Sequence, residues 1–262
     1  MSFLKKTAQL IQRVGFVPVR PYQTTAPIVH ALKENTPSNI LGWKPLASLM
    51  YAIPSFRQQH TRFDTNERII EIPWVFSQLD FKKKGKVLDI GWLESTVAVS
   101  LATAGFEVTG VDLRAGELHH PNLTSIAGDI CKNSFAANTF DYVILLSTLE
   151  HIGLDTMYGS VEESSTDQKA IDECLRVLKA GGKLLLTTPV AKHSHQDSFM
   201  RWYTTAGLKK MLSAWDNVTS SYYVPSKDRH YWKESSATAL PETPAFGVAL
   251  ITAEKPKTQR KS

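Results

Sequence analysis

The chain has 262 residues, of which 42% are hydrophobic and 21% are charged. This composition is typical of a folded globule, and the length suffices for one large α/β domain with an added segment. The net charge of +5 is spread along the chain, which disfavours nucleic acid as a partner. Two distant cysteines predict neither a disulfide framework nor a thiolate metal site. No apolar run approaches the ~20 residues of a membrane span, and no signal-peptide core is present, so we expect a cytoplasmic protein.

The N-terminal part of the chain predicts a separate cap over residues 1–64. Residues 3–14 have the apolar spacing of a short amphipathic helix. We expect this helix to pack on its own protein, with weak contact at a membrane surface or with a partner helix as the second interpretation. Prolines then recur at positions 18, 21, 27, 37, 45 and 54, which predicts an irregular, partly helical segment.

A helix is predicted next, over residues 65–79. Thr65 or Asn66 is the expected N-cap, and Pro73 should kink the helix or mark the start of a second one. The segment leads directly into a strand at residues 87–90.

From Lys86 the pattern alternates between short apolar strands and helices. The expected strands are residues 87–90, 106–112, 125–129, 140–147 and 183–189. A helix capped by Ser95 or Thr96 should end at Gly105, and the strongest helix pattern covers residues 166–182. Strands that alternate with helices predict right-handed crossovers and a mostly parallel sheet.

The alternation ends after Pro189. Residues 204–215 predict a helix and residues 218–224 a strand, and a polar loop over 225–244 leads to a last strand at 248–253. Two strands without a helix between them can pair antiparallel. We therefore predict an α/β fold: a Rossmann-like, seven-stranded, mostly parallel sheet with an antiparallel last strand. The domain should span residues 65–254, with a basic C-terminal tail over 255–262.

Five segments carry the chemistry. In chain order they are VLDIGWLES (87–95), VTGVDLR (108–114), AGDI (127–130), FDYVILLSTLEHIG (140–153) and LRVLKAGGKLLLTTP (175–189). Their order and spacing resemble the class I S-adenosylmethionine-dependent methyltransferases, in particular the branch called methyltransferase type 11. The resemblance covers about 100 residues and implies S-adenosylmethionine as the cofactor.

The resemblance assigns each matching residue a role in cofactor binding. Asp112 should accept hydrogen bonds from the two ribose hydroxyls, with capping of its turn as the alternative. Asp129 should meet the adenine amine, with Ile130 beside the ring, unless Asp129 is only a solvated turn residue. Gly91 should let the backbone approach the amino-acid end of the cofactor, and Asp89 should support that loop or bind the ammonium.

Leu146 and Ser147, at the end of the fourth predicted strand, should line the floor near the methionine moiety. The chain departs from the family at Leu93 and Ser95, where two further glycines are usual. Side chains there restrict positive φ, so the loop should differ in shape or the cofactor should sit further out.

His151 is the first candidate for a catalytic base, because it follows the fourth strand and imidazoles accept protons near neutral pH. The alternative is a histidine that only packs on the loop. His193 and His195 lack a third ligand, so no metal site is predicted. The segment 201–203 resembles an Arg-x-Tyr element that either borders the acceptor pocket or anchors the following helix.

The sequence therefore predicts a methyltransferase that acts on a small-molecule or carbohydrate acceptor, at oxygen, with the N-terminal cap contributing acceptor contacts. Residues 147–150 are Ser-Thr-Leu-Glu, where base-amine methyltransferases carry an Asn-Pro-Pro-Tyr-type tetrad, and this disfavours a nucleic-acid acceptor. A catalytically inactive, methyltransferase-like binding or assembly module is the alternative. A nicotinamide-dependent oxidoreductase would need a Gly-x-Gly-x-x-Gly turn, which is absent.

Overall fold

The computed structural model describes residues 66–116, 118–154, 166–227 and 231–257. The chain divides into two compact units, residues 1–66 with 227–231 and residues 67–226 with 232–262. The predicted N-terminal cap, with its amphipathic helix, lies outside the described residues. The fold described below is that of the second unit.

The centre of this unit is an eight-stranded sheet with the order β3-β2-β1-β4-β5-β10-β8-β9. In this order the strands are Leu123–Ala127, Glu107–Asp112, Lys86–Ile90, Phe140–Leu146, Leu178–Val190, Gly247–Glu254, Asp216–Pro225 and Trp232–Ser235. The first five are parallel, whereas β10 runs antiparallel to both β5 and β8. The predicted sheet type is confirmed. The eighth strand, β9, lies within the segment that was predicted to be a polar loop.

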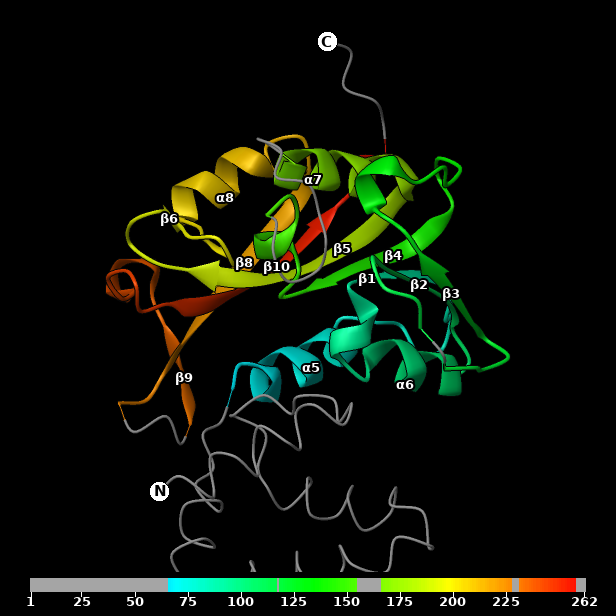
Figure 1. Cartoon of the computed structure of the whole chain (residues 1–262), viewed down its shortest axis with the longest axis horizontal. Helices are drawn as coiled ribbons and strands as arrows, with labels where there is room; N and C mark the ends of the chain where they lie inside the picture. The colour runs from blue at the N-terminus through cyan, green and yellow to red at the C-terminus, as the bar shows by residue number, and fades with distance from the viewer. Residues whose placement is uncertain (1–65, 117, 155–165, 228–230, 258–262) are drawn as a thin grey trace, which may run out of the picture. The chain divides into compact units, whose positions relative to one another are not determined.

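Helices cover both faces of the sheet (Figure 1). They are α5 (Arg68–Ser77), α6 (Val97–Thr103), α7 (Thr166–Val177) and α8 (Thr205–Met211). Apolar residues of α5 and α6 pack with one set of strand side chains, and those of α7 and α8 pack with the other. Strands buried on both faces need nearly continuous apolar sequence, which explains the pattern of β4 and β5. A small hairpin, β6 (His195–Gln196) with β7 (Arg201–Trp202), follows β5.

The start of α5 differs from the prediction. Glu67 occupies the N-cap position and makes no side-chain cap, so the predicted cap at Asn66 is wrong, and Thr65 lies outside the described residues. The helix continues through Pro73, so no second helix begins there. Its apolar packing, rather than a cap, holds it against the sheet.

The boundary between α7 and β5 also differs. The helix ends at Val177 instead of residue 182, and the strand begins at once. Gly181, with a φ of +76°, donates its N–H to the carbonyl of Lys255 over 2.9 Å, and the backbone N–H of Lys255 donates to the carbonyl of Gly182 over 2.9 Å. This pairing with the far end of the chain, together with the pairing of Leu178 with Phe140 in β4, extends the strand backwards through a segment that by local pattern favours a helix.

The topology fixes where a ligand can bind. From β1 the chain moves outward to β2 and β3, and it then returns to β4 on the other side of β1. The strand order therefore reverses between β1 and β4, and in open α/β sheets ligands bind at the carboxyl ends of the strands at such a reversal. The predicted site residues all lie at this edge or in the loops that follow it.

Candidate functional site

Gly91 begins the loop that follows β1. Its φ is +77°, and its N–H donates to the carbonyl of Val111 over 2.7 Å. A Cβ at this position would lie 2.5 Å from Oγ1 of Thr148, which follows β4. Glycine is therefore needed both for the backbone conformation and for the close approach of the two loops at the strand reversal.

The two departures from the glycine pattern cause no backbone strain. Residues Trp92–Glu94 form a 3-10 turn, and Ser95 is extended, with a φ of −146°. Within residues 91–96, positive φ occurs at Gly91 alone. The side chain of Leu93 packs against the core beneath α5 and α6, and Oγ of Ser95 accepts the N–H of Val97 over 3.2 Å. Ser95 therefore satisfies the first N–H of α6, whereas Thr96, at the N-cap position, makes no side-chain cap.

Trp92 anchors this loop, and sequence reasoning missed it. Its side chain is 3% exposed and lies against Gly110 and Gly116, where an added Cβ would come within 2.6 Å and 2.3 Å of the indole, respectively. Glycines in β2 and just after it therefore form the slot that receives the ring. The sequence offered one signal for this contact: a tryptophan in the loop after β1, followed by one glycine in β2 and another in the turn after β2.

Asp89, the last polar residue of β1, is almost completely buried, with 1% exposure. It accepts a hydrogen bond from the backbone of Ala98 in α6, but its Oδ2 has no hydrogen-bond partner among the described residues. Burial raises the pKa of this carboxyl to about 7; Arg68 lowers it in part, and Asp112 adds to the rise. A buried acceptor without a partner is costly, so the position suits a ligand that supplies a donor.

Asp112 ends β2 and is 7% exposed. Arg114 holds it: Nε donates to Oδ1 over 2.9 Å, Nη2 donates to Oδ2 over 3.1 Å, and the backbone N–H donates to Oδ1 over 3.0 Å. Nη2 of Arg114 also lies 2.9 Å from Oε1 of Glu94 in the loop after β1. Arg114 therefore links the ends of β1 and β2 at the position that was predicted to hold a ribose.

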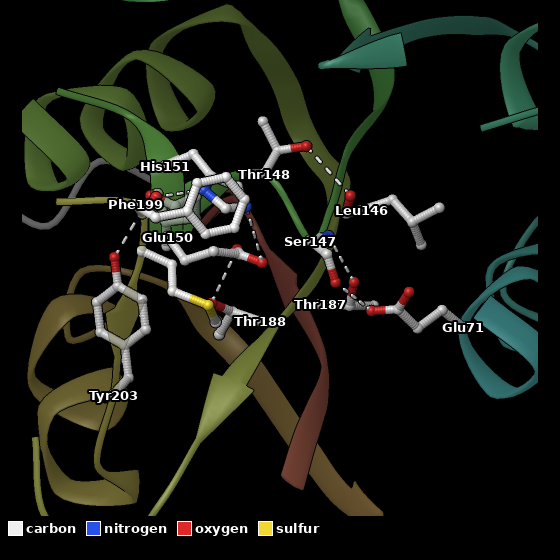
Figure 2. A network of polar contacts seen from close by, with 12 residues as sticks. Glu71, Leu146, Ser147, Thr148, Glu150, His151, Thr187, Thr188, Phe199 and Tyr203 are labelled. Carbon is white, nitrogen blue, oxygen red and sulfur yellow. Dashed lines mark hydrogen bonds and ion pairs between the residues drawn. The ribbon is translucent and has the colours of Figure 1, made fainter. Parts of the chain in front are cut away.

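Helix α5 adds two charged residues, Arg68 and Glu71, and Figure 2 shows Glu71 beside Ser147 at the end of β4. Glu71 is completely buried and accepts from Nη1 of Arg68 and from Oγ of Ser147, both over 2.6 Å. Ser147 has a φ of +44°, and its N–H donates to Oγ1 of Thr187 over 2.9 Å. The buried Leu146 presents its carbonyl to Arg68 over 3.4 Å. Sequence reasoning missed Arg68 and Glu71, whose only signal was two charges inside an apolar segment.

Asp129 and Ile130 follow β3. The carboxylate of Asp129 accepts the N–H of Cys131 over 2.9 Å and so caps a 3-10 turn, and it lies 3.7 Å from Nζ of Lys132. Ile130 is 4% exposed and belongs to the core beneath α7. Asp129 thus has a turn-capping role, and its contact with adenine stays a prediction.

His151 lies in a 3-10 turn after β4. Its Nδ1 is 2.7 Å from the carbonyl of Phe199, and its ring stacks obliquely on the Phe199 ring, with centroids 4.6 Å apart (Figure 2). A carbonyl only accepts, so Nδ1 carries a proton and the neutral ring has its lone pair on Nε2. Nε2 lies 3.9 Å from Oε1 of Glu150. Burial raises the pKa of Glu150 to about 8, and Oγ1 of Thr188 donates to its other oxygen over 3.2 Å.

The other polar residues singled out in the sequence either hydrogen-bond neighbouring segments of the fold or lie on the surface. Arg201 donates to the carbonyl of Ile152 over 2.6 Å, and the hydroxyl of Tyr203 donates to Asp167 over 3.0 Å, so both anchor the hairpin to α7 and the loop after β4. His193 pairs with an exposed glutamate, whereas His195 stacks on Trp202. Within the part of the chain that the structure describes, histidines, cysteines and acids form no group that could hold a metal ion.

Residues 88–186 match the family model described as a methyltransferase domain. These residues form a methyltransferase domain. The match begins within β1 and ends within β5, so it includes Asp89, Gly91, Asp112 and His151, together with the strand reversal between β1 and β4.

Relatives and solved structures agree with this domain assignment. Demethylmenaquinone methyltransferases of Renibacterium salmoninarum and Paenarthrobacter aurescens are both 32% identical, over 52% and 46% of this chain and 53% and 44% of their own length. The chain thus spans about half the length of the curated relatives that it matches. Among solved structures, the MccD protein has a TM-score of 0.51 and 14% identity, covering 71% of this chain and 96% of its own. The 1,6-didemethyltoxoflavin-N1-methyltransferase of Burkholderia thailandensis has a TM-score of 0.50 and 15% identity, covering 82% of this chain and 90% of its own. These two structures share the fold.

The site of the methyltransferase domain fits the chemistry of S-adenosylmethionine, the methyl donor of this family. The cofactor carries an ammonium and a sulfonium, and the site presents three buried carboxyl groups, Asp89, Glu71 and Glu150, beside the guanidinium of Arg68. The orphaned Oδ2 of Asp89 can accept from an ammonium. In the described ranges, no helix combines the length and hydrophobicity that a membrane crossing requires.

Proposed function

We propose that this protein transfers a methyl group from S-adenosylmethionine to a small-molecule acceptor. The observation that carries the proposal is the pair of buried carboxylates at the ends of adjacent parallel strands, Asp89 on β1 and Asp112 on β2, at the strand reversal of a methyltransferase domain. Asp89 has an oxygen without a partner among the described residues, beside a loop that needs glycine. This is the arrangement in which open α/β sheets hold a nucleoside.

Each end of the cofactor then has residues to hold it. Asp112 would accept from the ribose hydroxyls and Asp89 from the ammonium. Asp129 and Ile130 would meet the adenine. Leu146 and Ser147 would lie beside the methionine moiety, where the contact of Ser147 with Glu71 fixes its side chain over 2.6 Å. Strain at Ser147, whose φ is +44°, is of the kind that accumulates at binding sites.

The cofactor supplies a methyl group that its sulfonium already activates, so the protein has mainly to align the acceptor and manage its proton. We assign the proton to His151. The carbonyl of Phe199 fixes the Nδ1–H tautomer over 2.7 Å, which leaves Nε2 as the basic nitrogen. A proton taken up at Nε2 would lie 3.9 Å from Oε1 of Glu150, whose pKa burial raises to about 8, so an imidazolium there would favour the ionised form of this carboxyl.

The names of the relatives support an acceptor of the demethylmenaquinone type, which is a quinone methylated at carbon. They give no support to a carbohydrate acceptor or to methylation at oxygen. A base such as His151 suits a ring hydroxyl in the reduced quinone, because removing its proton makes the neighbouring ring carbon more nucleophilic. A demethylated quinol is therefore the first acceptor to test.

The alternative of an inactive binding module depended on Leu93 and Ser95. Neither residue takes a positive φ, so their side chains impose no strain on the loop. This removes the backbone-strain argument for the module, and the enzyme remains the proposal.

The test is a methyl-transfer assay with S-adenosylmethionine labelled in its methyl group and a reduced demethylated quinone. The proposal expects label in the extracted product and none with Asp112→Ala. Transfer to no member of a panel of small-molecule acceptors, by a folded protein that binds the cofactor, would instead favour the binding module.

A further inference from the structure

The carboxylate that is assigned to the cofactor ribose is already held through both of its oxygens by a residue of its own chain. Arg114 presents three donors to Asp112: its backbone N–H and two side-chain N–H groups, at 2.9 to 3.1 Å. A carboxylate has about four acceptor positions in all. Asp112 is 7% exposed, so little of its surface remains for other donors.

A ribose that binds through two hydroxyls needs both oxygens of this carboxylate. The backbone N–H of Arg114 is compatible with this geometry because it occupies one lone pair of Oδ1. The guanidinium is not compatible, because its Nε and Nη2 bond to both oxygens at once in the fork geometry that suits a carboxylate. Ribose and guanidinium are thus alternative ligands of one group.

A second acid offers the guanidinium another position. Oε1 of Glu94 lies 2.9 Å from Nη2 of Arg114, and the side chains of Glu94 and Arg114 are 34% and 42% exposed. Glu94 belongs to the turn after β1, which the buried ring of Trp92 holds in place. Arg114 can therefore leave Asp112 without losing an ionic partner.

We propose that Arg114 is an internal competitor for the ribose-binding carboxylate, which moves to Glu94 when the cofactor binds and so sets cofactor affinity. The proposal rests on the proposed function, because it assumes that Asp112 binds the ribose. Its consequence is that the affinity of the wild-type protein lies below the intrinsic affinity of the site, by the free energy needed to displace the guanidinium.

The expected change in cofactor affinity follows from how far the side chain of Arg114 is exposed to solvent. Arg114 is 42% exposed, so water screens much of its attraction to Asp112, and half-exposed pairs of this kind contribute modestly. We expect removal of the guanidinium to tighten cofactor binding by roughly three- to tenfold.

Calorimetric titration of the full chain with S-adenosylmethionine and, separately, S-adenosylhomocysteine tests the proposal. The variants are Arg114→Ala and Arg114→Gln, and Lys86→Ala is the matched control. Lys86 pairs with Glu107 over 2.8 Å at the opposite ends of β1 and β2, so its removal changes the net charge equally without freeing Asp112. The two ligands share the ribose, but S-adenosylhomocysteine lacks the sulfonium charge.

Similar tightening for both ligands in both Arg114 variants, with no change in Lys86→Ala, supports competition for the ribose site. Tightening for S-adenosylmethionine alone would mean a simple charge effect and would overturn the proposal, as would unchanged or weaker binding of both ligands. If the wild type binds and Asp112→Ala does not, the proposed function stands whatever the Arg114 variants do. If neither the wild type nor any variant binds either ligand, both the competition by Arg114 and the proposed function are wrong.

Glu94→Gln tests the second half of the proposal. Removing the alternative partner makes displacement of the guanidinium harder, so we expect cofactor binding to weaken by about two- to threefold when Arg114 is present. In the Arg114→Ala background the same change should have no effect. An equal loss in both backgrounds would show that Glu94 acts on the ligand directly and that it is not the alternative partner of Arg114.

Discussion

Replacing Asp89 by asparagine should change how stability depends on pH. Burial raises the pKa of this carboxyl from 3.8 to about 7. Between these values the native state holds a proton that the unfolded state has released, so stability falls as pH rises from about 4 to about 7 and then stays low. A shift of about three units corresponds to about 4 kcal/mol over the whole window. The amide of the Asp89→Asn variant cannot ionise, so this part of the pH dependence should disappear.

The measurement is the free energy of unfolding in urea, followed by circular dichroism in steps from about pH 5 to about pH 8. The difference between wild type and Asp89→Asn should change by about 1.4 kcal/mol per pH unit up to about pH 7. Glu107→Gln, which removes an exposed carboxylate from β2, is the control and should follow the wild type. Parallel curves for wild type and Asp89→Asn would mean that Asp89 is ionised in the native protein throughout and that burial does not raise its pKa.

Three further substitutions test the site. Gly91→Ala should destabilise the protein by about 1–3 kcal/mol, because alanine opposes the positive φ and its Cβ would clash with Thr148. Thermal unfolding measures the loss of stability, and adding Thr148→Ala to the same chain should recover part of it. His151→Gln should lower kcat for methyl transfer by about 10²–10⁴-fold while cofactor affinity changes little; retained kcat would mean that His151 only packs. Glu150→Gln should remove a fall in stability between about pH 4.5 and about pH 8, since burial raises the pKa of Glu150 from 4.5 to about 8; an unchanged pH profile in urea unfolding would contradict this.

The sheet was predictable from sequence because its strands carry their own signal. The strands β1, β4 and β5 are mostly apolar and buried on both faces. A helical pattern or a turn separates consecutive strands along the chain. The boundary at Leu178 was not predictable, because Leu178 pairs with Phe140, and Gly181 and Gly182 pair with Lys255, all of which join residues far apart in the chain. The same holds for β9, whose polar sequence pairs with β8 only at the sheet edge.

The site residues were predictable only where they lie at the carboxyl end of a strand or directly after it. Asp89, Gly91 and Asp112 were expected at one edge of the sheet, and they lie there because parallel strands bring their carboxyl ends together. Glu71 could not be found in this way, because its place beside Ser147 depends on how α5 packs on the sheet. Arg114 was visible in the sequence, but only the folded turn shows that its guanidinium faces back onto Asp112.

Titration calorimetry of the full chain with S-adenosylmethionine is the sharpest test of whether this site holds the cofactor. We expect binding of one cofactor molecule by the wild type and its loss in Asp112→Ala, because the ribose hydroxyls would lose their acceptor. No binding by the folded wild-type protein at millimolar cofactor, or equal binding by Asp112→Ala, would show that the carboxylate at the end of β2 does not bind the ribose.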